Sequence, residues 1–224
     1  MITKPDYDTA AIKAMQLLID NNITETPINP LPIMLNYPGV RVVPFTRMAD
    51  EAGIERKDLI PMFGVNQDAA TFHLKMQNMK DVNYVVFYNM RLPYEIIWRG
   101  IARELGHIVL KHDGSTRTPE ARLAEAMCFA HHLISPRPIL YLIQQSGVPL
   151  TMSVLAQTTG CSAECVEDMQ QIPLTNVPKE LNIKVRDLFS AHINEYLRFH
   201  AASPLKDKSP VLDFGTFMDG YKEG

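Results

Sequence analysis

The chain has 224 residues, of which 46% are hydrophobic and 21% are charged, and its formal net charge is −3. This length and composition allow a sizeable core, enough for one domain or slightly more. The small negative charge gives no reason to expect general attraction to nucleic acid or to an anionic membrane. A polar start, no long uninterrupted apolar run and an odd number of cysteines predict a soluble cytoplasmic protein without a disulfide framework.

The N-terminal part of the chain predicts a helix followed by three short strands. Apolar residues at helical spacing indicate an amphipathic helix over 8–22. The prolines at 27, 30 and 32 then favour an extended or turning chain. Runs of β-branched and aromatic residues predict strands, and a short helix is expected between the first two of them; the strands cover 40–45, 71–75 and 84–88, and the helix lies within 48–62.

Two long helices are predicted in the middle of the chain. Apolar residues recur at helical spacing over 92–112, and the pair Asp113-Gly114 ends the pattern. The second helix begins with Thr118 as its N-cap and runs to about residue 135. Strands followed by a helix pair predict an α+β domain over 1–146, with the two helices packed side by side.

The composition changes after Gly147. Two short helices are expected over 151–158 and 162–171, and a longer amphipathic helix over 180–199. Residues 147–200 are therefore expected to form a small helical region, and 201–224 a flexible tail.

The two short helices have the outline of a helix-turn-helix DNA reader, but their charge argues against that function. No lysine or arginine lies between Arg137 and Lys179. Contacts to DNA phosphates need such donors, and they supply most non-specific affinity for DNA. The segment is therefore expected to pack or to dock a protein rather than to bind nucleic acid.

The first long helix carries residues with the spacing of a zinc-peptidase site. Residues four apart lie on one face of a helix, so side chains at 103 and 107 can approach the same ion. Glu104 stands where such sites carry the general base for a metal-bound water. Glu125 on the second long helix would supply a third ligand, which requires that the two predicted helices lie next to each other.

Two motifs resemble those of the ImmA/IrrE family of metallopeptidases. They are Ala102-Arg103-Glu104-Leu105-Gly106-His107, with His112 downstream, and Glu125-Ala126-Met127-Cys128-Phe129-Ala130. The resemblance covers residues 8 to 145. It implies a zincin-like α+β domain in which a small sheet packs on the helix pair. It also implies a zinc cofactor held by His107 and Glu125, Glu104 as the general base and His112 as a supporting residue.

The same resemblance implies a function. Relatives in this family act in the regulation of phages and mobile elements, where they cleave or inactivate a helix-turn-helix repressor. A repressor-type protein is therefore the expected substrate or partner, and no direct contact with nucleic acid or membrane is expected.

Arg103 departs from the family pattern, which has the first zinc-binding histidine at this position. A guanidinium offers five donors and no acceptor and keeps its charge, so it cannot ligate zinc. We expect it to form a bidentate ion pair with Glu125 or Glu104 instead. Histidine and arginine codons can differ by one base, so a variant of a single isolate is another explanation of Arg103.

Two functional hypotheses follow from this departure. In the first, the site is degenerate and poor in zinc, and it binds a repressor-type partner without cutting it. In the second, the chain is an active zinc endopeptidase that cleaves the repressor. A third, structural, hypothesis is that the domain only stabilises an assembly through its C-terminal helix.

Other side chains offer a replacement for the missing ligand. Cys128 and His132 follow Glu125 by three and seven residues and lie near its face of the helix, so a rearranged metal site is an alternative. Against this, an unpaired cysteine such as Cys128 usually behaves as a small buried residue. Cys161 and Cys165 form a C-x-x-x-C pattern with no second pair, and we expect both in the core.

Overall fold

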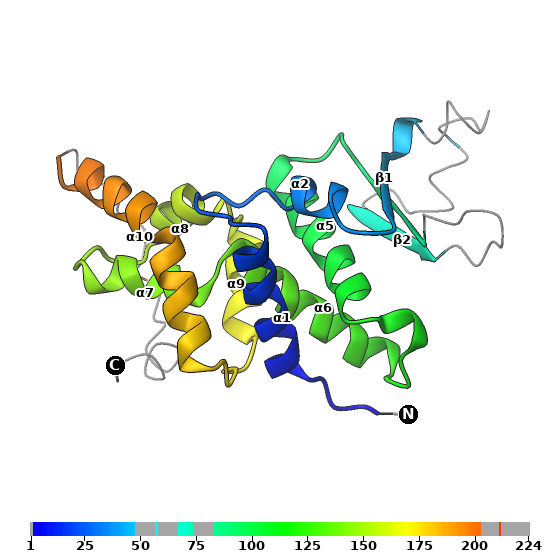
Figure 1. Cartoon of the computed structure of the whole chain (residues 1–224). Helices are drawn as coiled ribbons and strands as arrows, with labels where there is room; N and C mark the ends of the chain where they lie inside the picture. The colour runs from blue at the N-terminus through cyan, green and yellow to red at the C-terminus, as the bar shows by residue number, and fades with distance from the viewer. Residues whose placement is uncertain (1, 48–56, 58–66, 74–82, 203–210, 212–224) are drawn as a thin grey trace. The chain divides into compact units, whose positions relative to one another are not determined.

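A computed structural model describes residues 2–47, 57, 67–73, 83–202 and 211 (Figure 1). Within these residues the chain has an α+β fold that is mostly helical and contains one small mixed sheet. The chain divides into two compact units, Met1–Pro5 with Asn29–Ala130 and Asp6–Ile28 with His131–Gly224. None of the described helices is long and apolar enough to cross a membrane.

The sheet of the first unit has three strands in the order β1-β3-β2. These strands are β1 (Val40–Pro44), β2 (Ala69–His73) and β3 (Tyr84–Tyr88), and α2 (Pro30–Leu35) precedes them. The central strand β3 runs parallel to β1 and antiparallel to β2. Val86 at its middle is fully buried. The sheet therefore contributes to the core of this unit, and its β2 and β3 strands pack against α5.

The two long helices of the motifs are α5 (Tyr94–Val109) and α6 (Pro119–Ile134), joined through the short 3₁₀ helix η1 (His112–Gly114). Gly106 of α5 faces α6 at close range. A Cβ atom there would lie 3.0 Å from Cδ1 of Phe129 and 3.1 Å from the carbonyl oxygen of Ala126. The two helices thus meet at Gly106, where the missing side chain makes the approach possible. That they pack side by side along their length stays a prediction.

The second unit is helical. It contains α1 (Tyr7–Asp20), α7 (Arg137–Gln145), α8 (Met152–Thr159), α9 (Ala163–Gln171) and α10 (Lys179–Ala202). Helix α10 packs on α7 and α1 through one apolar face, on which Val185, Phe189 and Ile193 are buried. The predicted division of the chain at residue 146 stays a prediction.

Most predicted elements are present, with shifts at their ends. The strands predicted over 40–45 and 84–88 are confirmed, and the middle strand lies at 69–73 rather than 71–75. The helices predicted over 8–22, 92–112, 118–135, 151–158, 162–171 and 180–199 are also confirmed. Most of the expected helix within 48–62 and most of the expected tail fall outside the described residues.

Two prolines were misleading, because each stands at the beginning of a helix. The segment expected to be extended around Pro30 contains α2, and the short helix α7 after Pro136 was not predicted. Proline at the first positions of a helix loses no hydrogen bond, because the N–H groups there have no intrahelical acceptor. The side chain of Asn29 accepts from the Leu31 N–H at 3.0 Å and caps α2.

We expect a valine at Gly106 to destabilise the first unit. Its Cβ alone would lie within 3.0 to 3.2 Å of Phe129 and Ala126, so the helices must separate or the ring must move. Overpacking of this kind costs about 1 to 3 kcal/mol of unfolding free energy. Urea denaturation should show this loss for Gly106→Val but a much smaller change for Gly114→Val, where a Cβ meets nothing within 4 Å. Equal losses in the two variants would contradict close packing at Gly106.

Candidate functional site

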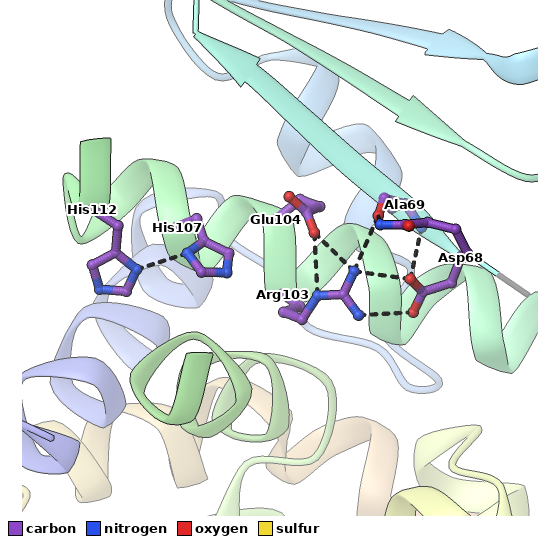
Figure 2. A network of polar contacts seen from close by, with 7 residues as sticks. Asp68, Ala69, Arg103, Glu104, His107 and His112 are labelled. Carbon is purple, nitrogen blue, oxygen red and sulfur yellow. Dashed lines mark hydrogen bonds and ion pairs between the residues drawn. The ribbon is translucent and has the colours of Figure 1, made fainter. Parts of the chain in front are cut away.

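Arg103 is held by two carboxylates at the junction of α5 and β2 (Figure 2). Its Nη1 and Nη2 atoms donate to Oδ2 and Oδ1 of Asp68 at 3.0 and 2.8 Å, which makes a bidentate ion pair. Its Nε and Nη2 atoms both donate to Oε1 of Glu104, at 3.1 and 2.8 Å. The Arg103 side chain is 16% exposed, and those of Asp68 and Glu104 are 11% and 9% exposed. The three charges therefore interact largely out of contact with water.

The bidentate partner of Arg103 differs from both predicted candidates. It is Asp68, which lies directly before β2, whereas Glu104 offers one oxygen and Glu125 forms no part of this contact. Asp68 also accepts from the Ala69 N–H at 2.7 Å. It is separated from Arg103 by 35 positions, so no spacing rule connects the two. Gly100 leaves room for the Asp68 carboxylate beside α5, because a Cβ atom at this position would lie 2.7 Å from Cγ of Asp68.

A second polar chain connects His107 to the second motif. The backbone at Lys111 takes the left-handed conformation, with φ of 56°, just after α5 and directly before His112. The ring of His112 then contacts Nδ1 of His107 through its own Nδ1 at 2.8 Å, and Oε2 of Glu125 through its Nε2 at 3.0 Å. Arg117 reaches Oε1 of Glu125 at 3.1 Å. His112 thus stands between the two predicted zinc ligands.

The surroundings of the two histidines determine which ring nitrogen carries a proton. Burial, together with the nearby His112 and Arg103, lowers the pKa of His107 to about 4. Burial also lowers the pKa of His112, against the opposing effect of its hydrogen bond to Glu125. Both rings are therefore neutral near pH 7. The Glu125 carboxylate, paired with Arg117, accepts a hydrogen bond from the Nε2–H group of His112.

The remaining tautomers follow from that hydrogen bond. A neutral His112 protonated on Nε2 has a lone pair on Nδ1, so the contact at 2.8 Å requires His107 to donate from its own Nδ1. Nε2 of His107 then carries a lone pair. Glu125 in this way sets the chemical character of His107 through an intermediate ring.

A pocket of about 350 Å³ opens between these networks and is lined by Glu104, His107 and His112. The sequence did not predict its other polar lining residues, which are Thr71, His73, Tyr84, Asp113 and Arg122. They include donors, one carboxylate and a phenol ring within a volume typical of ligand pockets. The arrangement can therefore hold a polar side chain or a short peptide segment.

Three contacts fix the polar wall of this pocket. His73 Nδ1 lies 3.1 Å from Oδ2 of Asp113 and its ring stacks on that of Tyr84 at 5.0 Å. Burial, and then the charge of Asp113, raise the pKa of Tyr84, which therefore stays a neutral hydroxyl. Arg122 donates from Nη1 to the carbonyl oxygen of His112 at 3.0 Å. Sequence spacing carried no signal for these residues, because they come from separate elements.

The side chains present do not fit a three-ligand zinc site. Arg103 has no lone pair to offer, which leaves His107 and Glu125 as two predicted ligands, and both oxygens of Glu125 already accept from His112 and Arg117. In the part of the chain that the structure describes, no three histidine, cysteine, aspartate or glutamate side chains are grouped to hold a metal ion. Zinc ligation by His107 and Glu125 stays a prediction.

The alternative ligands of the second motif lie elsewhere. Cys128 is fully buried, as expected of a small core residue, and does not line the pocket. His132 contacts the hydroxyl oxygen of Thr175 through Nε2 at 3.3 Å. A rearranged metal site built on Cys128 or His132 therefore stays a prediction.

No protein-family model, curated protein or solved structure matches this chain. The resemblance to the ImmA/IrrE family accordingly stays a prediction from the two sequence motifs.

We expect Arg103→Met to destabilise the first unit by about 3 to 5 kcal/mol, because it leaves two buried carboxylates without their cation. Arg186→Met is the matched control. Its ion pair with Asp187 is exposed, with side chains 41% and 61% accessible, and its loss should cost less than about 1 kcal/mol. Urea denaturation of both variants measures the difference. A loss no larger in Arg103→Met than in Arg186→Met would contradict a buried ion pair.

The lowered pKa of His107 predicts a loss of stability in mild acid. The unfolded chain binds a proton on this ring below about pH 6.5, whereas the folded chain does so only near its pKa of about 4. The free energy of unfolding should therefore decrease as the pH falls from 6.5 toward 4. The decrease should be smaller in His107→Asn, whose amide can still donate to His112. NMR titration of the ring tests the cause directly, and a midpoint near 6.5 would contradict it.

Proposed function

We propose that this chain is an ImmA/IrrE-like protein of phage or mobile-element regulation, which binds a repressor-type protein in the cytoplasm without cutting it. One observation carries the proposal. The guanidinium of Arg103 forms a bidentate ion pair with Asp68 and also engages Glu104, so a side chain supplies the positive charge that a metal ion supplies in such sites.

The rest of the site supports binding rather than hydrolysis. Hydrolysis of a peptide bond in such a site needs a base to activate water and a Lewis acid to stabilise the developing charge. Glu104 stands at the position of the base, but its Oε1 accepts two bonds from Arg103. The pocket of about 350 Å³ keeps its polar lining, which suits recognition of a peptide segment.

We further propose that the first unit is zincin-like. Helix α5, which carries the first motif, packs on β2 and β3, and α6 brings Glu125 to the same region. These features agree with a small sheet packed on a helix pair.

An active zinc endopeptidase is the second candidate, favoured by one observation. Glu104 and His107 both line the pocket, and Nε2 of His107 carries a lone pair. In that case another group must replace the missing ligand, and the repressor is a substrate instead of a partner.

Metal analysis of the purified chain beside an Arg103→His variant separates the two candidates. We expect the unmodified chain to contain far less than one zinc per molecule, because position 103 carries a fixed positive charge. Restoring histidine should raise the zinc content. Stoichiometric zinc in the unmodified chain would overturn the proposal of a degenerate site.

A second experiment tests the partner class by incubating the chain with a candidate helix-turn-helix repressor. We expect a complex that resists chelators and leaves the repressor intact. A discrete cleavage that Glu104→Gln abolishes would establish the endopeptidase instead. If a panel of repressors gives no complex and no cleavage, this partner class is excluded.

A further inference from the structure

Two cysteines of the second unit lie close enough to react with each other. Cys161 follows Gly160, which ends α8 in the left-handed conformation with φ of 70°, and Cys165 stands in the first turn of α9. Their sulfur atoms are 3.3 Å apart. The C-x-x-x-C spacing predicted core positions, and burial confirms this, with 5% and 2% of the two residues exposed. Burial in the core does not by itself explain why the thiols face each other.

Two features of the fold lie next to the sulfur of Cys165, an imidazole and a helix N-terminus. Nδ1 of His131 lies 3.7 Å from the sulfur of Cys165. The Cys165 N–H donates to the hydroxyl of Ser162 at 3.3 Å, and the Val166 N–H donates to the Ser162 carbonyl at 3.1 Å, which places Ser162 as the N-cap of α9. The N-terminus of α9 faces the sulfur, and Nδ1 of His131 is placed to take up the thiol proton. Cys165 is therefore the expected nucleophile of the pair.

The backbone around the pair is also fixed. The Cys161 N–H donates to the hydroxyl of Thr159 at 3.3 Å, and that hydroxyl donates to the carbonyl of Leu155 at 2.7 Å. The two sulfurs must approach from 3.3 Å to the bonded distance of about 2.05 Å, a movement that side-chain rotation can supply. Both ends of the future bond are therefore already in place.

We propose that Cys161 and Cys165 form a reversible oxidation site whose oxidant is hydrogen peroxide. The Cys165 thiolate attacks one peroxide oxygen, the O–O bond breaks, and Cys165 becomes a sulfenic acid while hydroxide leaves. Hydroxide takes up the proton that the Cys165 thiol released. The Cys161 sulfur then attacks the sulfenic sulfur, the S–S bond forms, and the hydroxyl leaves as water with the Cys161 proton. Two thiols and one peroxide give one disulfide and two waters.

The low exposure of the pair decides which oxidants reach it. A small neutral molecule such as peroxide can approach a sulfur of which little is accessible, whereas a bulky disulfide reagent cannot. The bond would close a loop of a few residues between the turn after α8 and the start of α9. Such a short loop removes little chain entropy, so its effect on overall stability is expected to be small.

The test uses the full chain and counts free thiols after exposure to peroxide. The reduced chain contains three cysteines in the thiol form and should take up three N-ethylmaleimide labels after denaturation. After peroxide it should take up a single label, on Cys128, and peptide mapping should find Cys161 linked to Cys165. Dithiothreitol should restore all three labels. The folded chain should form the bond faster than the same chain in urea, because folding brings the sulfurs to 3.3 Å.

Matched variants locate the reaction. Cys128→Ser should still lose two labels, whereas Cys161→Ser should form no internal disulfide. Circular dichroism checks that each variant is folded. Three labels after peroxide, a bond that includes Cys128, a bond between two chains, or faster oxidation in urea than in the folded state would each overturn the proposal.

Discussion

The guanidinium of Arg103 is the charge around which the first unit is arranged. It joins the residue before β2 to the middle of α5, since Asp68 and Glu104 share it as their common cation. A buried ion pair of this kind contributes little net stability compared with an apolar core, because all three charges lose their hydration. Its role is geometric. Once the three groups are buried, each requires the others in place, and this fixes the start of the sheet edge against the helix.

The contacts of His112 with His107 and Glu125 also depend on the nearby charge of Arg103. The positive charges of Arg103 and Arg122 help to keep His107 neutral. A neutral His107 is what allows His112 to stand between it and Glu125 with one defined set of protons. The two polar networks are therefore electrostatically coupled although no hydrogen bond joins them. A change of charge in one alters the protonation of the other, so the pocket responds as a unit.

The sequence predicted the elements better than it predicted their contacts. The helical spacing of apolar residues and the capping residues located α5 and α6, whose close approach at Gly106 the structure shows. The helix after Pro136 was missed because proline at a helix start was treated as a break. Pro119 stands at the beginning of α6 in the same way, after the N-cap residue Thr118.

The site was predictable only where its residues share a helix. Arg103, Glu104 and His107 follow from the spacing along α5, and Glu125 from the second motif. Asp68, His73 and Asp113 come from segments whose approach depends on the tertiary fold, and no local pattern marks them. For this reason the partner of Arg103 was expected among the carboxylates of the motifs themselves.

Arg103 supplies positive charge to this site from within the polypeptide, whereas a metal ion must be taken up from solution. A bound ion occupies its site only as far as its free concentration allows, and it can be removed by competition. The charge of Arg103 is part of the polypeptide and is present as soon as the chain is made. Under the proposed function, the geometry that Asp68 and Glu104 impose on this unit does not depend on the cell's supply of metal, and scarcity of zinc leaves it unchanged.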